Sequence, residues 1–126
     1  MGIKVGQLVL EVGRGPDSDL NLHQAIAAAT GTELLAGKAS EVVDAVIIWW
    51  REDDGDLVDE LVDGLTYLTD EGAIWVLTPK SGRAGHVEPS DIQDSAPTAG
   101  LSQTSSFSCA PDWTATKLVA RKASRK

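Results

Sequence analysis

The chain has 126 residues, 42% of them hydrophobic and 24% charged, an ordinary composition for a globular protein that argues against disorder of the whole chain. Its net charge of −8 opposes binding to phosphate backbones, which argues against a general nucleic-acid-binding role. One cysteine and two histidines are too few for a structural zinc site, and neither a secretory signal nor an apolar run of membrane length is visible. These features predict one cytoplasmic domain at residues 1–121 and a basic, frayed tail at 122–126, with contact to an acidic partner or RNA as the tail's alternative role.

The first half of the chain predicts a strand, a helix and a second, weaker strand. A short apolar run ends at Gly13, which is typical of a buried strand closed by a glycine turn. Asp19 can cap a helix whose apolar residues recur at helical spacing, and Gly31 ends that helix. Ser40 is placed to cap a short helical turn that reaches Val43. The three main elements are expected at residues 8–12, 20–30 and 33–36.

The strongest strand signal is the run Ala45–Trp50, which follows Asp44 and is apolar without alternation. Such a run belongs in the centre of a sheet that is covered on both faces. After an acidic turn at residues 52–55, leucines at helical spacing predict an amphipathic helix that ends at residues 70–72. The leucines of its apolar face are Leu57, Leu61, Leu65 and Leu68. The acidic residues of the opposite face are Asp56, Asp59, Glu60 and Asp63.

The second half predicts another buried strand, a short helix and a hairpin. Pro89 suits the first turn of the helix, and Pro97 and Gly100 end it. Two weakly alternating segments flank the turn Ala110-Pro111-Asp112 and predict the hairpin. The whole order predicts an α/β fold, Rossmann-like, with a mainly parallel sheet flanked by helices and one antiparallel strand near an edge. The elements of this half are expected at residues 73–77, 89–96, 101–109 and 113–121.

This order of elements, together with Leu10-Glu11-Val12-Gly13-Arg14-Gly15, resembles the start of a class I S-adenosylmethionine-dependent methyltransferase. In that fold the first strand ends in an acidic residue and a glycine-rich turn that lies against the cofactor. Residues 44–48 resemble its fourth strand, residues 72–77 its fifth, and the hairpin its sixth and seventh. The resemblance therefore implies that Glu11, Gly13 and Gly15 face a cofactor.

More closely, the whole chain resembles a small actinobacterial family, domain-of-unknown-function family 3052. The strings that carry this resemblance include residues 54–59, Thr78-Pro79-Lys80, residues 85–92, residues 96–104 and Asp112-Trp113. The family carries no settled activity, so the resemblance implies a fold more than a function.

The glycine turn departs from the cofactor-binding pattern. Asp17 replaces the third glycine and Pro16 removes an amide donor, so a pyrophosphate ligand is disfavoured, while the cationic sulfonium of S-adenosylmethionine is penalised less. Leu35-Ala36-Gly37-Lys38 stands where an acidic ribose ligand is expected, and no third strand is evident before Asp44. These departures favour a structural tight turn over a bound cofactor.

A candidate ligand rim lies where the predicted parallel strands end, because ligands of open α/β sheets bind beyond the carboxyl ends of the strands. In the loop at residues 78–86, Lys80 and Arg83 can hold an anion and His86 can move a proton near neutral pH. The alternative is structural: solvated cations, a turn-forming histidine and tryptophans in the core. No nucleophile with its base is identifiable. The residues of the candidate ligand rim are Glu11, Gly13, Gly15, Trp49, Trp50, Arg51, Lys80, Arg83 and His86.

The acidic helix face at residues 56–63 is either a solvated surface or a docking face for a basic partner. The preceding acidic turn lacks the ligand spacing of a calcium loop, and helix capping explains its carboxylates, so no metal site is predicted. Two functions remain open. The preferred one is a non-catalytic binding or regulatory module that has kept a methyltransferase-like fold without its cofactor, with a protein or small molecule as partner and no role at a membrane. The alternative is a small S-adenosylmethionine-dependent methyltransferase.

Overall fold

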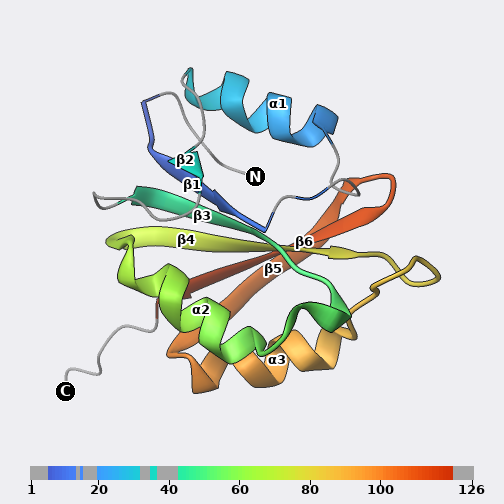
Figure 1. The fold of residues 1–126 in the computed structure, drawn as a ribbon. Coiled ribbons are helices and arrows are strands. Elements are labelled where there is room, and N and C mark those ends of the chain that lie inside the picture. Colours follow the sequence, from blue (N-terminus) through green and yellow to red (C-terminus); the bar gives the residue numbers. More distant parts are fainter. Residues whose placement is uncertain (1–5, 14, 16–19, 32–34, 37–42, 121–126) are drawn as a thin grey trace.

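The structure is a computed structural model that describes residues 6–13, 15, 20–31, 35–36 and 43–120. Its described part contains a mixed sheet, three α-helices and a short 3-10 turn (Figure 1). The strands are β1 (Val9–Val12), β2 (Leu35–Ala36), β3 (Val43–Trp49), β4 (Leu68–Pro79), β5 (Leu101–Ala110) and β6 (Trp113–Ala120). The helices are α1 (Leu20–Thr30), α2 (Leu57–Thr66) and α3 (Pro89–Thr98), and the 3-10 turn is η1 (Glu52–Asp54).

The six strands lie in the order β2-β1-β3-β4-β6-β5. The first four are parallel to one another, and β6 runs antiparallel to both β4 and the edge strand β5. The register places Leu10 beside Val46 and Val46 beside Ile74 in the sheet centre. The predicted α/β fold, with its mainly parallel sheet and its single reversed strand near an edge, is confirmed.

Helices cover both faces of this sheet. Helix α1 lies on one face, and α2 and α3 lie on the other (Figure 1). The run at residues 45–50 therefore contributes to two cores: Ile47 and Trp49 pack on the α1 side, whereas Val46, Ile48 and Trp50 pack on the side of α2 and α3. This two-sided burial explains why the run is apolar without alternation.

Two predicted helix ends are wrong. Helix α2 ends at Thr66, and Leu68 is the first residue of β4. The spacing of Leu68 from the preceding leucines predicts instead that it belongs to the helix. The chain turns at Tyr67, whose amide donates to the Gly64 carbonyl and whose carbonyl accepts from Val43 at the start of β3. Helix α3 continues through Pro97 to Thr98, because a proline in the last turn removes only one amide donor and the residue before it keeps helical geometry.

Other boundaries differ by a few residues. Strand β3 starts at Val43, β4 reaches Pro79, and β1 starts at Val9. The predicted capping roles of Asp19 and Ser40, the start of the second predicted strand and the basic tail lie outside the described residues. Within the described part of the chain, no helix has both the length and the apolar character that crossing a membrane requires.

Gly64 is buried in the interior of α2, where it faces the sheet. A Cβ atom there would lie 3.4 Å from Ile74 Cδ1 and 3.6 Å from Val46 Cγ1, which is ordinary van der Waals contact. Alanine has a higher helix propensity than glycine. We therefore expect Gly64→Ala to raise the free energy of unfolding by up to about 1 kcal/mol, as measured by urea denaturation. A loss of stability would contradict this expectation and would show that the new methyl group is not accommodated between α2 and the sheet.

Candidate functional site

The carboxyl ends of β1, β3 and β4 meet at one edge of the sheet, as predicted. Arg51, which follows β3, is the residue that joins them: its Nη1 donates to the Gly13 carbonyl at 2.6 Å and to the Trp49 carbonyl at 3.1 Å. The loop after β4 packs on the same side chain, since the Gly85 carbonyl accepts from the Glu52 amide and a Cβ on Gly85 would lie 3.1 Å from Arg51 Cβ. The turns that follow these three strands therefore share one rim.

Glu11 is buried at the end of β1, with 5% of its surface exposed. Its Oε2 accepts a hydrogen bond from Trp49 Nε1 at 2.8 Å, and its carboxylate lies 2.9 Å from Nδ1 of His23 on α1. A buried carboxylate needs such donors, because an unpaired one carries a large desolvation cost. Glu11 thus ties β1 to β3 and to α1 through its side-chain oxygens.

Gly13 occupies a backbone conformation that suits glycine, with φ of +80°. A Cβ atom at this position would lie 2.6 Å from the Trp49 carbonyl oxygen, closer than any side chain tolerates. The glycine therefore serves a close approach between the ends of β1 and β3. Gly15 is half-buried, whereas Arg14 and residues 16–19 of the same turn lie outside the described residues.

The two adjacent tryptophans of the predicted rim lie on opposite faces of β3. Trp49 is 1% exposed and meets the Trp113 ring edge-on at a centroid distance of 4.8 Å. The guanidinium of Arg51 lies 5.4 Å from the centroid of the Trp113 ring, which adds a cation–π contact beneath the rim. Trp50 is buried against the cores of α2 and α3. Both tryptophans are core residues, in accordance with the structural alternative.

The remaining rim residues sit on the loop after β4 and have local partners. Lys80 Nζ donates to Ser108 Oγ, and Arg83 forms an exposed ion pair with Asp112 at 2.7 Å. His86 Nδ1 lies 2.9 Å from the Pro79 carbonyl, which favours the predicted turn-forming role. The contacts described for these three side chains are with this loop and the hairpin, and none of them is with Gly13.

Sequence reasoning missed His23 and Trp113 as members of this network. His23 lies 12 residues from Glu11 and Trp113 lies far along the chain, and both contacts depend on which face of the sheet a side chain occupies. The parallel order of β1 and β3 supplies the one signal that was available, since it places Glu11 beside Ile47 and two residues from Trp49.

The predicted acidic face of α2 divides into separate roles. Asp56 caps the helix, since its carboxylate accepts from the Val58 amide at 2.9 Å, and Asp59 is exposed. Glu60 and Asp63 line a hollow of about 350 Å³ between α2 and the sheet. Burial first, and then the neighbouring carboxylates of Asp63 and Asp54, raise the pKa of Glu60 above its usual value.

Comparison with protein families decides the membership of the chain. A family model described as a protein of unknown function, DUF3052, matches residues 1–122. The chain belongs to the DUF3052 family. Uncharacterised proteins of Mycobacterium bovis and Mycobacterium tuberculosis are 48% identical to this DUF3052 protein over 119 residues, which cover 94% of the chain and 75% of theirs.

Solved methyltransferases share the fold of the DUF3052 protein. The glycopeptide N-methyltransferase MtfA, complexed with S-adenosylmethionine, has a TM-score of 0.66 at 11% identity, with 94% of this chain and 83% of MtfA covered. The CcbJ methyltransferase of Streptomyces caelestis has a TM-score of 0.65 at 10% identity, with 95% and 86% covered. The O-methyltransferase NcsB1, complexed with S-adenosylhomocysteine, has a TM-score of 0.67 at 12% identity, with 91% and 49% covered. At these identities the likeness shows the methyltransferase-like fold alone.

Proposed function

We propose that this DUF3052 protein is a non-catalytic binding module built on a methyltransferase-like fold. The single observation that carries the proposal is the position of Arg51, whose guanidinium bridges the carbonyls of Gly13 and Trp49. In the methyltransferases that the sequence resembles, the turn after the first strand lies against the cofactor. Here the Gly13 carbonyl of that turn accepts from Arg51, which directly follows the neighbouring strand and Trp50 in the same chain.

The acidic residue at the end of β1 supports the same proposal. The Glu11 carboxylate is buried and engaged by the Trp49 indole and by His23. A ligand amine or hydroxyl at this carboxylate would have to displace donors that already satisfy it, and that exchange yields little net free energy. Through these contacts the group contributes to the stability of the domain.

A small S-adenosylmethionine-dependent methyltransferase is the second candidate. It is favoured by the positive φ of Gly13 directly after a strand that ends in Glu11-Val12, and by neighbours of the same fold that bind the cofactor.

Thermal melts with S-adenosylmethionine and S-adenosylhomocysteine, each at 2 mM, distinguish the two functions. A ligand present at 100 times its Kd stabilises the folded state by about 2.7 kcal/mol, which gives a rise of several degrees in Tm. We expect no shift with either compound, while an active methyltransferase melted beside it shifts. A dose-dependent rise in Tm with both compounds would contradict the non-catalytic proposal.

A further inference from the structure

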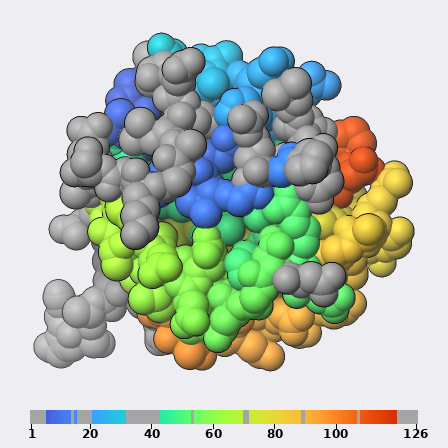
Figure 2. All heavy atoms as spheres, viewed as in Figure 1, coloured from blue at the N-terminus to red at the C-terminus, as the bar shows by residue number. Residues whose placement is uncertain are grey.

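The hollow beside α2, here called the α2 groove, lies on the face of the sheet opposite to α1. Its floor is formed by Leu10 and Val12 of β1 and by Val46 and Ile48 of β3. In Figure 2 the blue segment that contains β1 and the yellow-green atoms of α2 reach the same face of the molecule. The groove therefore lies between α2 and the strands β1 and β3, and it reaches the residues that directly precede the Gly13 and Trp49 carbonyls contacted by Arg51.

The topology explains why the sheet leaves room here. Helices α2 and α3 follow β3 and β4, and α1 covers the other face. Only residues 37–42 connect β2 to β3, whereas a parallel crossover that carries a helix needs about a dozen residues or more. Among the described residues, no helix lies on the β1 side of α2.

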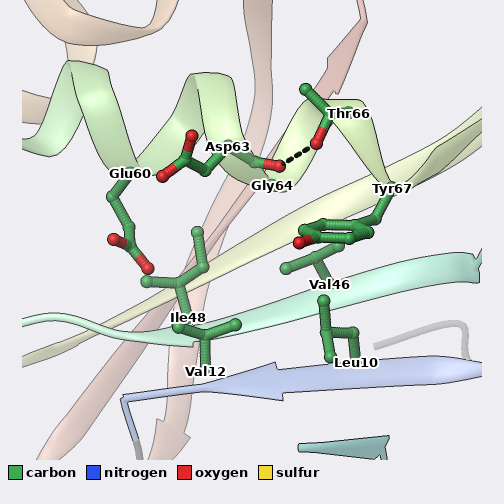
Figure 3. A pocket seen from close by; sticks show the side chains of 9 residues that line it. All are labelled: Leu10, Val12, Val46, Ile48, Glu60, Asp63, Gly64, Thr66 and Tyr67. Atoms are coloured by element: carbon green, nitrogen blue, oxygen red, sulfur yellow. Dashed lines mark hydrogen bonds between the residues drawn. The ribbon is translucent and has the colours of Figure 1, made fainter. Parts of the chain in front are cut away.

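The groove combines an apolar floor with oxygen groups on its walls. Figure 3 shows Glu60 extending from α2 toward Ile48 and Val12, with the Tyr67 ring over Val46 and its hydroxyl directed toward the side of Glu60. Asp63 adds a second carboxylate from the same helix, and its carbonyl accepts from the Thr66 hydroxyl. The described lining holds no lysine, arginine or histidine.

We propose that the α2 groove binds a small organic amine, with its apolar body on the strand residues and its ammonium group at Glu60. The volume of about 350 Å³ falls in the range of small-molecule sites, which are mostly apolar with a few placed polar groups. The charge of the lining selects a cation, because two carboxylates face the space and no described basic side chain balances them. The Tyr67 hydroxyl oxygen can accept one hydrogen bond from the ammonium group, and the Glu60 carboxylate can accept another.

The partial burial of Glu60 agrees with this ligand class. Its raised pKa means that burial and the carboxylates of Asp63 and Asp54 disfavour the charged form, and a bound ammonium group would favour that form. A carboxyl whose pKa is raised on folding costs stability at pH values above that pKa, and the cost disappears below its unfolded value. Glu60→Gln is therefore expected to fold, with a Tm at pH 7 equal to or above that of the parent protein.

Tryptamine is a suitable probe because it joins a flat apolar body to an ammonium group, and 3-ethylindole and indole-3-propionate are its neutral and anionic counterparts. In amide NMR titrations of the full chain, we expect tryptamine to bind with a Kd of about 1 mM, by the usual free energy per ligand atom, and to shift the amides of Val12, Ile48, Gly64 and Tyr67. The neutral analogue is expected to bind about tenfold more weakly and the anionic one more weakly still.

Glu60→Gln is expected to weaken tryptamine binding about tenfold, and Asp59→Asn provides the matched control. Asp59 is exposed on the same helix and outside the groove lining, so the control makes the same charge change and should leave the Kd unchanged.

Equal effects of the two variants, equal binding of the three indoles, or shifts at other amides would each overturn the proposal. So would a response to a basic amphipathic peptide without one to tryptamine, since the occupant would then be a protein segment. Because the melts at the strand-end rim use other ligands, the two proposals can fail independently.

Discussion

Gly13→Ala is expected to lower the free energy of unfolding by roughly 2–4 kcal/mol, since it combines two separate costs. The backbone at this position has φ of +80°, which an L side chain adopts at a cost of about 1–2 kcal/mol. The new Cβ would also lie 2.6 Å from the Trp49 carbonyl, so β1 and β3 would have to separate at their ends. Urea denaturation of the purified variant measures the loss.

Gly82→Ala separates the two costs. Gly82 has nearly the same backbone conformation, with φ of +87°, but a Cβ there would meet nothing within 4 Å. Its replacement should therefore cost only about 1–2 kcal/mol. If both alanine variants lose the same stability, the close approach of Gly13 to Trp49 contributes nothing, and the Arg51 bridge beside it becomes a weak basis for the proposed function.

The part of the fold that the sequence predicts well is the part set by local patterns. The run at residues 45–50 predicts the central strand because burial on both faces removes alternation, and helix α1 is predicted at its observed limits because apolar spacing and Gly31 agree. The rim also follows, since parallel strands bring their carboxyl ends to one edge. The strand and the helix depend on residues that are near one another in the chain, and the rim follows once the strands are taken to be parallel.

The features that the sequence does not predict depend on competition between distant residues. Leu68 fits the helical leucine pattern, but in the structure it pairs with Val43 as the first residue of β4. This strand pairing extends the sheet and outweighs the local helical pattern. This shift ends α2 at Thr66 and lets Tyr67 line the α2 groove, so the groove itself was not foreseen. Likewise, the contacts of Glu11 with Trp49 and of Gly13 with Arg51 depend on side-chain geometry that the glycine turn does not predict.

Trp49→Phe is expected to cost about 2–4 kcal/mol in free energy of unfolding, because it removes the indole N–H and part of a well-packed ring. The Trp49 side chain is buried and donates to Glu11 at 2.8 Å. Phenylalanine cannot donate this hydrogen bond, and the carboxylate is left buried with fewer donors. The loss can be measured by chemical denaturation at pH 7.

A double-mutant cycle with Glu11→Met isolates the hydrogen bond from the packing. Methionine has a similar length and no need of a donor, so Trp49→Phe should cost less in the Glu11→Met background by at least about 1 kcal/mol. Equal costs in the two backgrounds would mean that packing against Trp113 accounts for the whole effect. A coupled pair would support the proposed non-catalytic function, because a carboxylate already engaged by Trp49 gains little net free energy from a cofactor hydroxyl or amine. On the proposed function, the Glu11 and Arg51 contacts stabilise the ends of β1 and β3, and the α2 groove is the proposed ligand site.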